Sequence, residues 1–212
     1  MGKITAVEPQ AKRAERFNVY VDGQFVLEVS ALIAARLRVG QTLSEEEVAA
    51  LAREDALETA REYALRFLTP RPRSVAEIRQ HLARKKCAPD VIDEVLAHLR
   101  EVGLVDDAAF ARYWIENREQ FKPRAARALR MELKRKGLDD THIAAAIKGV
   151  DEHDSAYRAA EARAMRWLNL ERREFLEKMI AFLMRRGFEY AVAREAAQRV
   201  WETHQGSGVG SR

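Results

Sequence analysis

Apolar residues recur along this chain in three stretches that superimpose at a step of about fifty residues. When Leu82, Leu133 and Leu183 are taken as equivalent, six further apolar positions of each stretch also match. The matched triplets are Val75, Ala126 and Leu176; Ile78, Leu129 and Met179; Cys87, Leu138 and Phe188; Ile92, Ile143 and Ala193; Leu96, Ile147 and Ala197; and Leu99, Val150 and Val200. Self-similarity at this period predicts a tandem repeat protein. Because the units of such an array pack against their neighbours, we expect an elongated array with a long binding surface, and catalysis is the less favoured function.

Each repeat is expected to contain three helices, so the fold is predicted to be mainly α. In the first repeat, Ser74 and Glu77 form a capping-box pattern, Pro89 falls in the first turn of a helix and Gly103 follows a helix end. These punctuating residues place the domain limits. The predicted divisions are 1–54 for an N-terminal region, 55–106, 107–154 and 155–205 for three-helix repeats, and 206–212 for a flexible tail.

Proline and glycine also divide the later repeats. The second repeat is predicted to have helices at 107–121, 123–136 and 140–149, separated at Pro123, Gly137 and Gly149. In the third repeat, Ser155 or Asp154 is expected to cap the first helix, and Gly187 to end the second. The last helix is expected to reach about His204.

Residues 4–29 are predicted to form strands, because 17–21 and 25–29 alternate apolar and polar side chains, which is the pattern of β-strands. The dipeptide Asp22-Gly23 favours a two-residue hairpin turn. The apolar positions around this turn are Phe17, Val19 and Val21 before it and Phe25, Leu27 and Val29 after it. A lone hairpin is marginally stable, so we expect the segment 4–7 to add a third strand, or the sheet to pack on the next part of the chain.

A short helix and a long one are expected to connect this sheet to the first repeat. Ser30 is predicted to cap the short helix, which Gly40 ends. Ser44 with Glu47 fits a capping box that opens the long helix, which is expected to run to Leu68 with a break near 53–55.

The composition is helical, with 33% charged residues and a formal net charge of +4. This mild excess of positive charge permits contact with nucleic acid without requiring it. The single cysteine, Cys87, excludes an intramolecular disulfide, and its register with Leu138 and Phe188 favours an apolar packing role. Neither a secretory signal nor an apolar run of membrane-spanning length is seen, so a cytoplasmic location without membrane contact is expected.

A pair of basic residues follows each anchoring leucine. Cations in a last helical turn interact favourably with the helix dipole, so these pairs need no partner to explain them. The wider distribution of charge is more informative, because the segments 71–86 and 122–136 carry net charges of +5 and +6, whereas 89–101 and 139–154 carry −3 and −4. Separation of the two signs between helices indicates an oriented interaction with a large charged partner.

The middle repeat has the strongest basic surface, because Arg127, Arg130 and Lys134 lie one step around a helix from its apolar stripe. We define the predicted partner-binding residues as the basic surface. The basic surface consists of Arg79, Arg84, Lys85, Arg124, Arg127, Arg130, Lys134, Arg135, Lys136, Arg185 and Arg186. Aromatic residues at helical spacing could stack on bases, but core packing is the favoured role for Phe110, Tyr113, Trp114 and Trp167.

No phosphate-binding glycine loop, dinucleotide fingerprint, zinc-protease motif or paired-cysteine spacing occurs in the sequence. The acidic loop 151–154 could hold a metal, although a solvated loop is the better account. Asp106 and Asp107 precede a helix, so capping is favoured over an acid pair. We therefore expect no catalytic residue, no metal and no cofactor.

One stretch resembles a known family in detail. The segment 103–113, a glycine, two hydrophobic residues and two acids leading into a helix, is similar to a segment of the RecX family, which regulates the bacterial RecA recombinase. Lys122-Pro-Arg and the segment 129–138 are similar to that family's second repeat. The resemblance extends from about residue 15 to residue 204.

The resemblance implies three tandem three-helix modules that lie along the groove of a RecA filament on single-stranded DNA. It also implies a non-enzymatic regulator in recombination and DNA repair that blocks filament growth and reduces ATP hydrolysis and strand exchange. The residues themselves leave a second function open. Helices joined by the short turns at Lys86, Gly137 and Gly187 could act as helix-turn-helix units that bind single- or double-stranded DNA directly.

Overall fold

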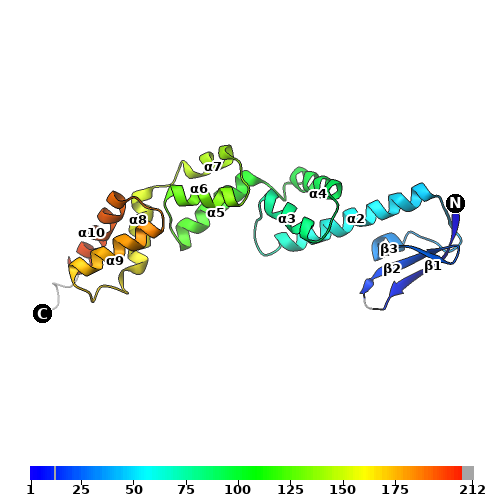
Figure 1. The fold of residues 1–212 in the computed structure, drawn as a ribbon, viewed down its shortest axis with the longest axis horizontal. Helices are drawn as coiled ribbons and strands as arrows, with labels where there is room; N and C mark the ends of the chain where they lie inside the picture. The colour runs from blue at the N-terminus through cyan, green and yellow to red at the C-terminus, as the bar shows by residue number, and fades with distance from the viewer. Residues whose placement is uncertain (12, 207–212) are drawn as a thin grey trace. The chain divides into compact units, whose positions relative to one another are not determined.

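The computed structural model describes residues 1–11 and 13–206, and within them the fold is mainly helical with a small N-terminal sheet, as predicted (Figure 1). The chain divides into two compact units, Met1–Val105 and a second unit that begins at Asp106. The tail predicted at 206–212 lies, after residue 206, outside the described residues. None of the described helices is long and apolar enough to cross a membrane.

The N-terminal sheet is antiparallel and has the strand order β3-β2-β1-β4. Its strands are β1 (Gly2–Gln10), β2 (Arg13–Val21), β3 (Gln24–Ser30) and β4 (Thr42–Leu43). The predicted turn between β2 and β3 is confirmed, since both Asp22 and Gly23 have positive φ. The additional strand predicted at 4–7 is confirmed as β1, which is longer than predicted. Phe25 departs from the expected alternation, because it is 57% exposed and meets Tyr20 edge-on at the sheet surface.

The sheet core forms from alternate residues of the strands, including Ile4, Val19 and Val29, closed by Ile33 and Leu43. Ile33 belongs to α1 (Ala31–Ala34), a helix much shorter than the sequence predicts. The expectation that Gly40 ends this helix is wrong. Gly40 instead lies in the connection to β4, where its positive φ lets its N–H donate to the carbonyl oxygen of Ile4 over 2.8 Å.

The long helix α2 (Glu45–Leu68) opens with the predicted capping box at Ser44 and ends at the predicted residue. The break predicted near 53–55 is wrong, because α2 is continuous over 24 residues. The polar residues that suggested a break include Asp55, which is buried against the sheet. A charged residue on the inner face of a helix therefore marks a tertiary contact here.

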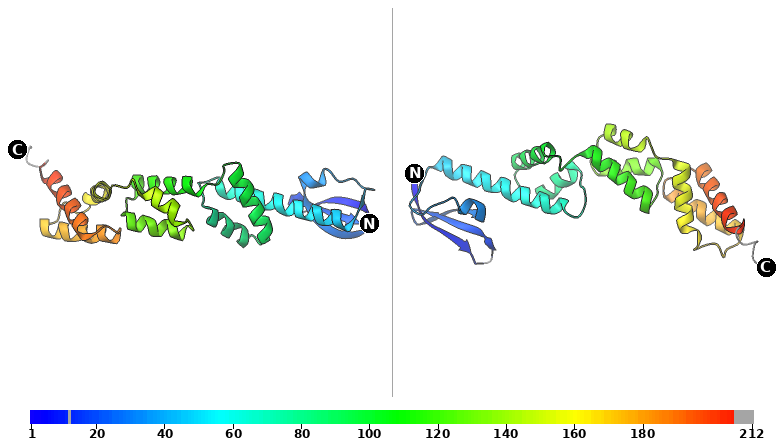
Figure 2. Two further views of the ribbon diagram at one scale, coloured as in Figure 1. Left: turned by 90° about the horizontal axis from the view of Figure 1, so that it is seen from above. Right: turned by 180° about the vertical axis from the view of Figure 1, so that it is seen from behind.

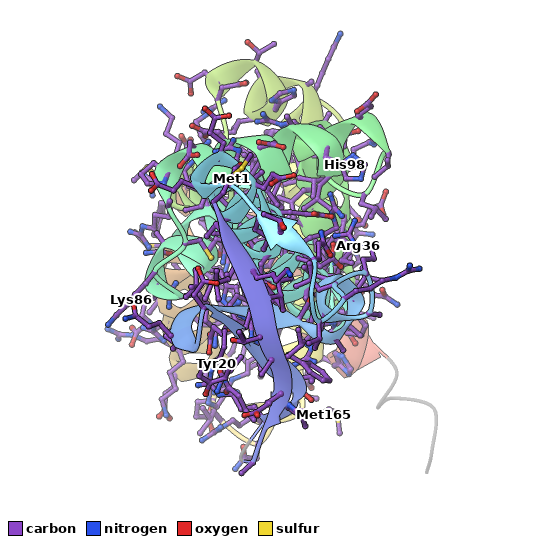
Figure 3. The ribbon with its side chains drawn as sticks, turned by 90° about the vertical axis from the view of Figure 1, so that its right-hand side faces the viewer. Met1, Tyr20, Arg36, Lys86, His98 and Met165 are labelled. Carbon is purple, nitrogen blue, oxygen red and sulfur yellow. The ribbon has the colours of Figure 1, made fainter. Side chains whose placement is uncertain are left out.

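The first three-helix unit combines the second half of α2 with α3 (Val75–Arg84) and α4 (Pro89–Glu101). The capping box at Ser74 and the proline in the first turn of α4 are both confirmed. The turn between α3 and α4 places Lys86 at a φ of 63°. Its exposed side chain extends away from the ribbon (Figure 3).

The second unit contains two further groups of three helices. The first group is α5 (Asp107–Phe121), α6 (Ala126–Arg135) and α7 (Asp140–Ile147), which lie together in both views of Figure 2. The second group is α8 (Glu152–Ala164), α9 (Arg172–Arg185) and α10 (Tyr190–Gly206). The expected cap of α8 is wrong: Asp151 accepts from the N–H groups of residues 153 and 154, so the helix begins earlier than Ser155 or Asp154 would allow.

The anchoring leucines of the three repeats have the same environment. Leu82, Leu133 and Leu183 are all fully buried, each in the core of its own three-helix group. The turns between the second and third helices also match, because Lys86, Gly137 and Gly187 all have positive φ. The register derived from apolar spacing is therefore the structural register. Its weakest members are Cys87, Ala126, Val150 and Leu176, which are only partly buried.

Candidate functional site

The predicted basic residues of the first repeat contact groups of that same repeat. Arg79 on α3 forms an ion pair with Asp93 on α4 at 2.6 Å. Arg84 donates to the carbonyl oxygen of Gln80, one turn earlier. The ammonium group of Lys85 lies 5.1 Å from the ring centroid of Tyr63. Contacts within the first repeat thus account for these cations without an external partner.

The second repeat presents more cations to solvent. Lys134 on α6 pairs with Asp140 on α7 at 3.0 Å, which repeats the α3–α4 pairing of the first repeat. Arg127 reaches the carbonyl oxygen of Gly187 over 3.4 Å. The side chains of Arg130 and Arg135 are exposed and make no hydrogen bond or ion pair with any described residue. Part of the charge separation therefore serves pairing inside a repeat, and the unneutralised remainder concentrates on α6.

The basic residues of the third repeat have two different environments. Arg185 is exposed, whereas Arg186 is partly buried with its guanidinium carbon 4.6 Å from the ring centroid of Phe182. Arg186 also donates to the carbonyl oxygen of Pro123 over 3.0 Å. Burial lowers the pKa of Arg186, and the nearby charges of Arg124 and Arg163 lower it further. Arg186 thus joins two repeats in addition to carrying charge.

This junction, which we call the repeat joint, is formed by residues 123–128 before and within α6 and by Arg186 and Gly187 after α9. The N–H of Ala125 donates to the carbonyl oxygen of Arg186 over 3.3 Å, and Ala125 is buried in the third-repeat core. The residue before α6, Ala125, has no side chain that could cap the helix. The carboxylate of Glu152 caps it instead, by accepting the N–H of Ala126 at 2.8 Å. Helix α6 begins at Ala126, three residues later than the predicted start at 123, because residues 123–125 belong to the repeat joint.

A pocket of about 570 Å³ opens on the second repeat, beside α5 and α6. Three residues of the basic surface line it: Arg124, Arg135 and Lys136. The structure adds Arg118 and Trp114 from α5, which the sequence did not single out as basic or polar contacts. The pocket therefore combines four cations from two helices and the segment that connects them. We call it the cationic pocket.

Glu132 lines the cationic pocket and contacts three of its other side chains. One carboxylate oxygen accepts both the indole N–H of Trp114 and the Nε–H of Arg118 at 2.8 Å. The other oxygen lies 3.1 Å from Nε of Arg124. Glu132 is the single acid of 122–136, so its isolation among seven basic residues is the signal that could have identified it.

The aromatic residues split between core and pocket. Phe110 is buried in the second-repeat core, as predicted. Trp114 is only partly buried, and the cationic groups of Arg118 and Lys136 lie 4.4 Å and 4.9 Å from its ring centroid. Trp167 packs at the margin of the third-repeat core. Trp114 thus packs against the core while its polar edge and a ring face contribute to the pocket.

Several other candidate groups have structural roles. Asp106 accepts from the N–H of Ala108 at 2.7 Å, which confirms that it caps α5. In the acidic loop, Asp151 caps α8 and Glu152 caps α6. Among the described residues, no group of three potential ligands could hold a metal ion. Cys87 packs against the first-repeat core, and burial raises the pKa of its thiol, which disfavours the reactive thiolate.

These features define a class of protein: three tandem three-helix domains behind an N-terminal antiparallel sheet, with cations concentrated on the middle domain. Family models cover the same organisation. The match to the "Regulatory protein RecX N-terminal domain" spans residues 2–44, and the first, second and third RecX three-helix domains match 60–99, 106–147 and 151–207. The chain belongs to the RecX family. The N-terminal match begins earlier than the resemblance noted from residue 15.

Curated relatives agree with this assignment. The chain is 30% identical to a Regulatory protein RecX of Lactobacillus delbrueckii subsp. bulgaricus, covering 93% of this chain and 74% of that protein. It is 29% identical to one of Leuconostoc mesenteroides, over 94% of this chain and 76% of that protein. A crystal structure of a regulatory protein RecX superimposes with a TM-score of 0.63 at 26% identity, covering 91% of this chain and 97% of the other.

Proposed function

We propose that this protein regulates the RecA recombinase by binding RecA and the groove of RecA filaments on single-stranded DNA. Binding there limits filament growth, and ATP hydrolysis and strand exchange fall as a consequence. The protein acts in the cytoplasm and does so by occupancy, without catalysis. Membership of the RecX family, whose relatives are named as regulatory proteins, is the observation that carries this proposal.

The exposed cations of α6 support a mechanism for this binding. Arg130 and Arg135 have no acidic partner among the described residues, so they are available to an anionic surface. A recombinase filament offers two such surfaces, acidic protein side chains and DNA phosphates. A protein that covers the groove would also compete with incoming duplex. The basic surface is therefore proposed as the contact region, with its centre on the second repeat.

The test is a RecA ATPase assay on single-stranded DNA with increasing amounts of this protein. The proposal requires inhibition that depends on the added protein and that needs a higher protein concentration when Arg127 and Arg130 are reversed in charge. Inhibition far below one molecule per RecA would indicate capping of filament ends, and a one-to-one requirement would indicate coating. Unchanged ATP hydrolysis at saturating protein would refute the proposal.

A second candidate is direct binding of nucleic acid. It is favoured by the matching tight turns between the second and third helices of each repeat, at Lys86, Gly137 and Gly187. Short turns of this kind join the helices of helix-turn-helix units. Affinity for bare DNA and for preassembled RecA filaments, measured at the same physiological salt, separates the two. Much tighter binding to filaments supports regulation of the recombinase, and equal binding supports the second candidate.

A further inference from the structure

The guanidinium groups of Arg118 and Arg124 share one carboxylate, that of Glu132, as their acidic partner. Both use Nε to contact Glu132, at 2.8 Å and 3.1 Å. Neither group makes a hydrogen bond from its terminal nitrogens within the described residues, so those donors remain for another acceptor. An arginine held at Nε presents its two terminal nitrogens as a preformed fork, which suits an anion with several oxygens.

The remaining lining completes the chemistry of the cationic pocket. Arg135 and Lys136 add two cations from the end of α6, so four positive side chains surround one carboxylate, a net charge of +3. The other wall is apolar, with Met131 half exposed and Ala128 beside it. The volume of about 570 Å³ lies within the range of small-molecule sites.

We propose that the cationic pocket is a phosphate site that takes one nucleotide unit. The phosphate lies in the forks of Arg118 and Arg124, and the sugar or base lies against Met131 and the edge of Trp114. A single acidic side chain would satisfy one fork and leave the second fork and most of the volume unused. A phosphate offers more acceptor oxygens, and its attached nucleoside matches the apolar wall.

This inference goes beyond regulation of the recombinase, because the site needs only a nucleotide and no second protein, and it gives the second candidate, direct binding of nucleic acid, a specific site. Its source is either a free mononucleotide or the backbone of a single strand. The two sources share the phosphate chemistry and differ in length, so competition experiments separate them. Binding to the pocket is measured without RecA, so its failure is distinguishable from a failure to inhibit the RecA ATPase.

The decisive variant is Glu132→Gln, tested by fluorescence anisotropy with a labelled oligothymidylate at physiological salt. The substitution removes a negative charge, so a merely basic surface would bind DNA more tightly. A pocket that depends on held guanidinium groups would bind roughly five-fold more weakly, because the donors are no longer preorganised. Glu116→Gln is the matched control, since Glu116 is exposed on the same helix as Arg118 and its substitution removes the same charge.

A second pair of variants keeps the charge constant and guards against misfolding of Glu132→Gln. The double substitution R118K/R124K removes both forks and is expected to weaken binding roughly ten-fold. Arg112→Lys, exposed on α5, is the control and should bind as the unaltered chain does. Thermal melting by circular dichroism verifies that each variant is folded. Equal affinity of R118K/R124K and Arg112→Lys, or tighter binding by folded Glu132→Gln than by Glu116→Gln, would overturn the proposal.

Competition assigns the source of the phosphate. Displacement of the oligonucleotide by thymidine monophosphate would show that a free nucleotide suffices. Binding of the oligonucleotide alone would identify the strand backbone as the ligand. If neither phosphate compound binds and an oligoglutamate peptide does, the pocket is a site for acidic protein and the proposal is wrong.

Discussion

Arg16 on β2 and Asp55 on α2 form a two-point ion pair, with nitrogen–oxygen distances of 3.0 Å and 2.7 Å. The same carboxylate accepts the N–H of Ser30 at 2.7 Å, at the end of β3. Burial alone would lower the pKa of Arg16, but the hydrogen bond and charge of Asp55, aided by Glu28, raise it. One carboxylate thus fastens two strands of the sheet to the long helix.

Asp55→Ala is expected to destabilise the N-terminal unit by about 3 kcal/mol, because the mostly buried guanidinium of Arg16 keeps only Glu28 as an acidic partner and the N–H of Ser30 loses its acceptor. Urea unfolding monitored by circular dichroism measures the change. Glu54→Ala is the matched control, since the neighbouring Glu54 pairs with Arg36 at an exposed site. The control should cost no more than about 1 kcal/mol. Similar losses for both variants would contradict a special role for Asp55.

Gly187→Ala is expected to weaken the repeat joint. Gly187 has a φ of +98°, and an added Cβ would lie 2.8 Å from the Cβ of Ala128 on α6. Gly103 also has positive φ, at +72°, but an added Cβ there meets nothing within 4 Å. Gly103→Ala therefore measures the effect of backbone strain alone. Gly187→Ala should lower the free energy of unfolding by about 2 kcal/mol more than Gly103→Ala does, because the added methyl group overpacks the joint. The comparison is made by thermal and urea unfolding.

The steric part of that loss should be reversible. Ala128→Gly removes the atom that the new methyl group meets, although glycine within a helix costs about 1 kcal/mol by itself. In a double-mutant cycle, Gly187→Ala and Ala128→Gly together should be less destabilising than the sum of the single changes. Strict additivity would show that the two residues do not press on one another.

Periodicity identified the repeat cores because the apolar skeleton is a local property of each helix. Leu82, Leu133 and Leu183 could be aligned from spacing alone, and all three are fully buried. Asp55 shows the opposite case. Its charge suggested a break in α2, and only its contact with a strand 39 residues earlier explains why it is buried. Contacts between distant segments are not encoded in the period of either segment.

In the candidate site, too, the sequence predicted what lies within one segment and missed what depends on contacts between helices. Sequence reasoning found cations in and beside α6 such as Arg124 and Arg135, because they form a charge cluster within one segment. It missed Arg118 and Glu132, which meet only when α5 packs beside α6. It also assigned Arg186 to the same surface as Arg185, although the two have different exposure, since adjacent residues on a helix point in different directions.

Charge reversal on the second repeat is expected to weaken binding to RecA filaments more than reversal on the first. Arg130→Glu places a negative charge at an exposed position without an acidic partner, whereas Arg79→Glu acts where Asp93 already neutralises the cation. We expect roughly ten-fold weaker filament binding for R127E/R130E at physiological salt, and a smaller change for Arg79→Glu. Sedimentation with preassembled filaments measures both. Equal effects, or no effect in folded variants, would refute the prediction.

Acidification is expected to destabilise the first three-helix unit through His81. Its ring stacks on Phe67 with centroids 4.2 Å apart. Burial lowers the pKa of His81, and the charges of Lys85, Arg84 and Arg73 lower it further. Because the folded pKa lies below the unfolded value of about 6.5, the unfolded chain binds the proton more readily. The contribution of neutral His81 is therefore complete above the unfolded pKa and is lost as the pH falls through the folded pKa.

The measurement compares free energies of unfolding near neutral pH and about one to two units below it, a window above the usual carboxylate range. His81→Gln should reduce the loss of stability between the two conditions, because it removes a group that takes up a proton on unfolding. His98→Gln is the control, since His98 is an exposed histidine on α4 of the same unit (Figure 3). An NMR titration should place the folded pKa of His81 below 6.5. A titration at or above that value would remove the cause of the predicted acid sensitivity.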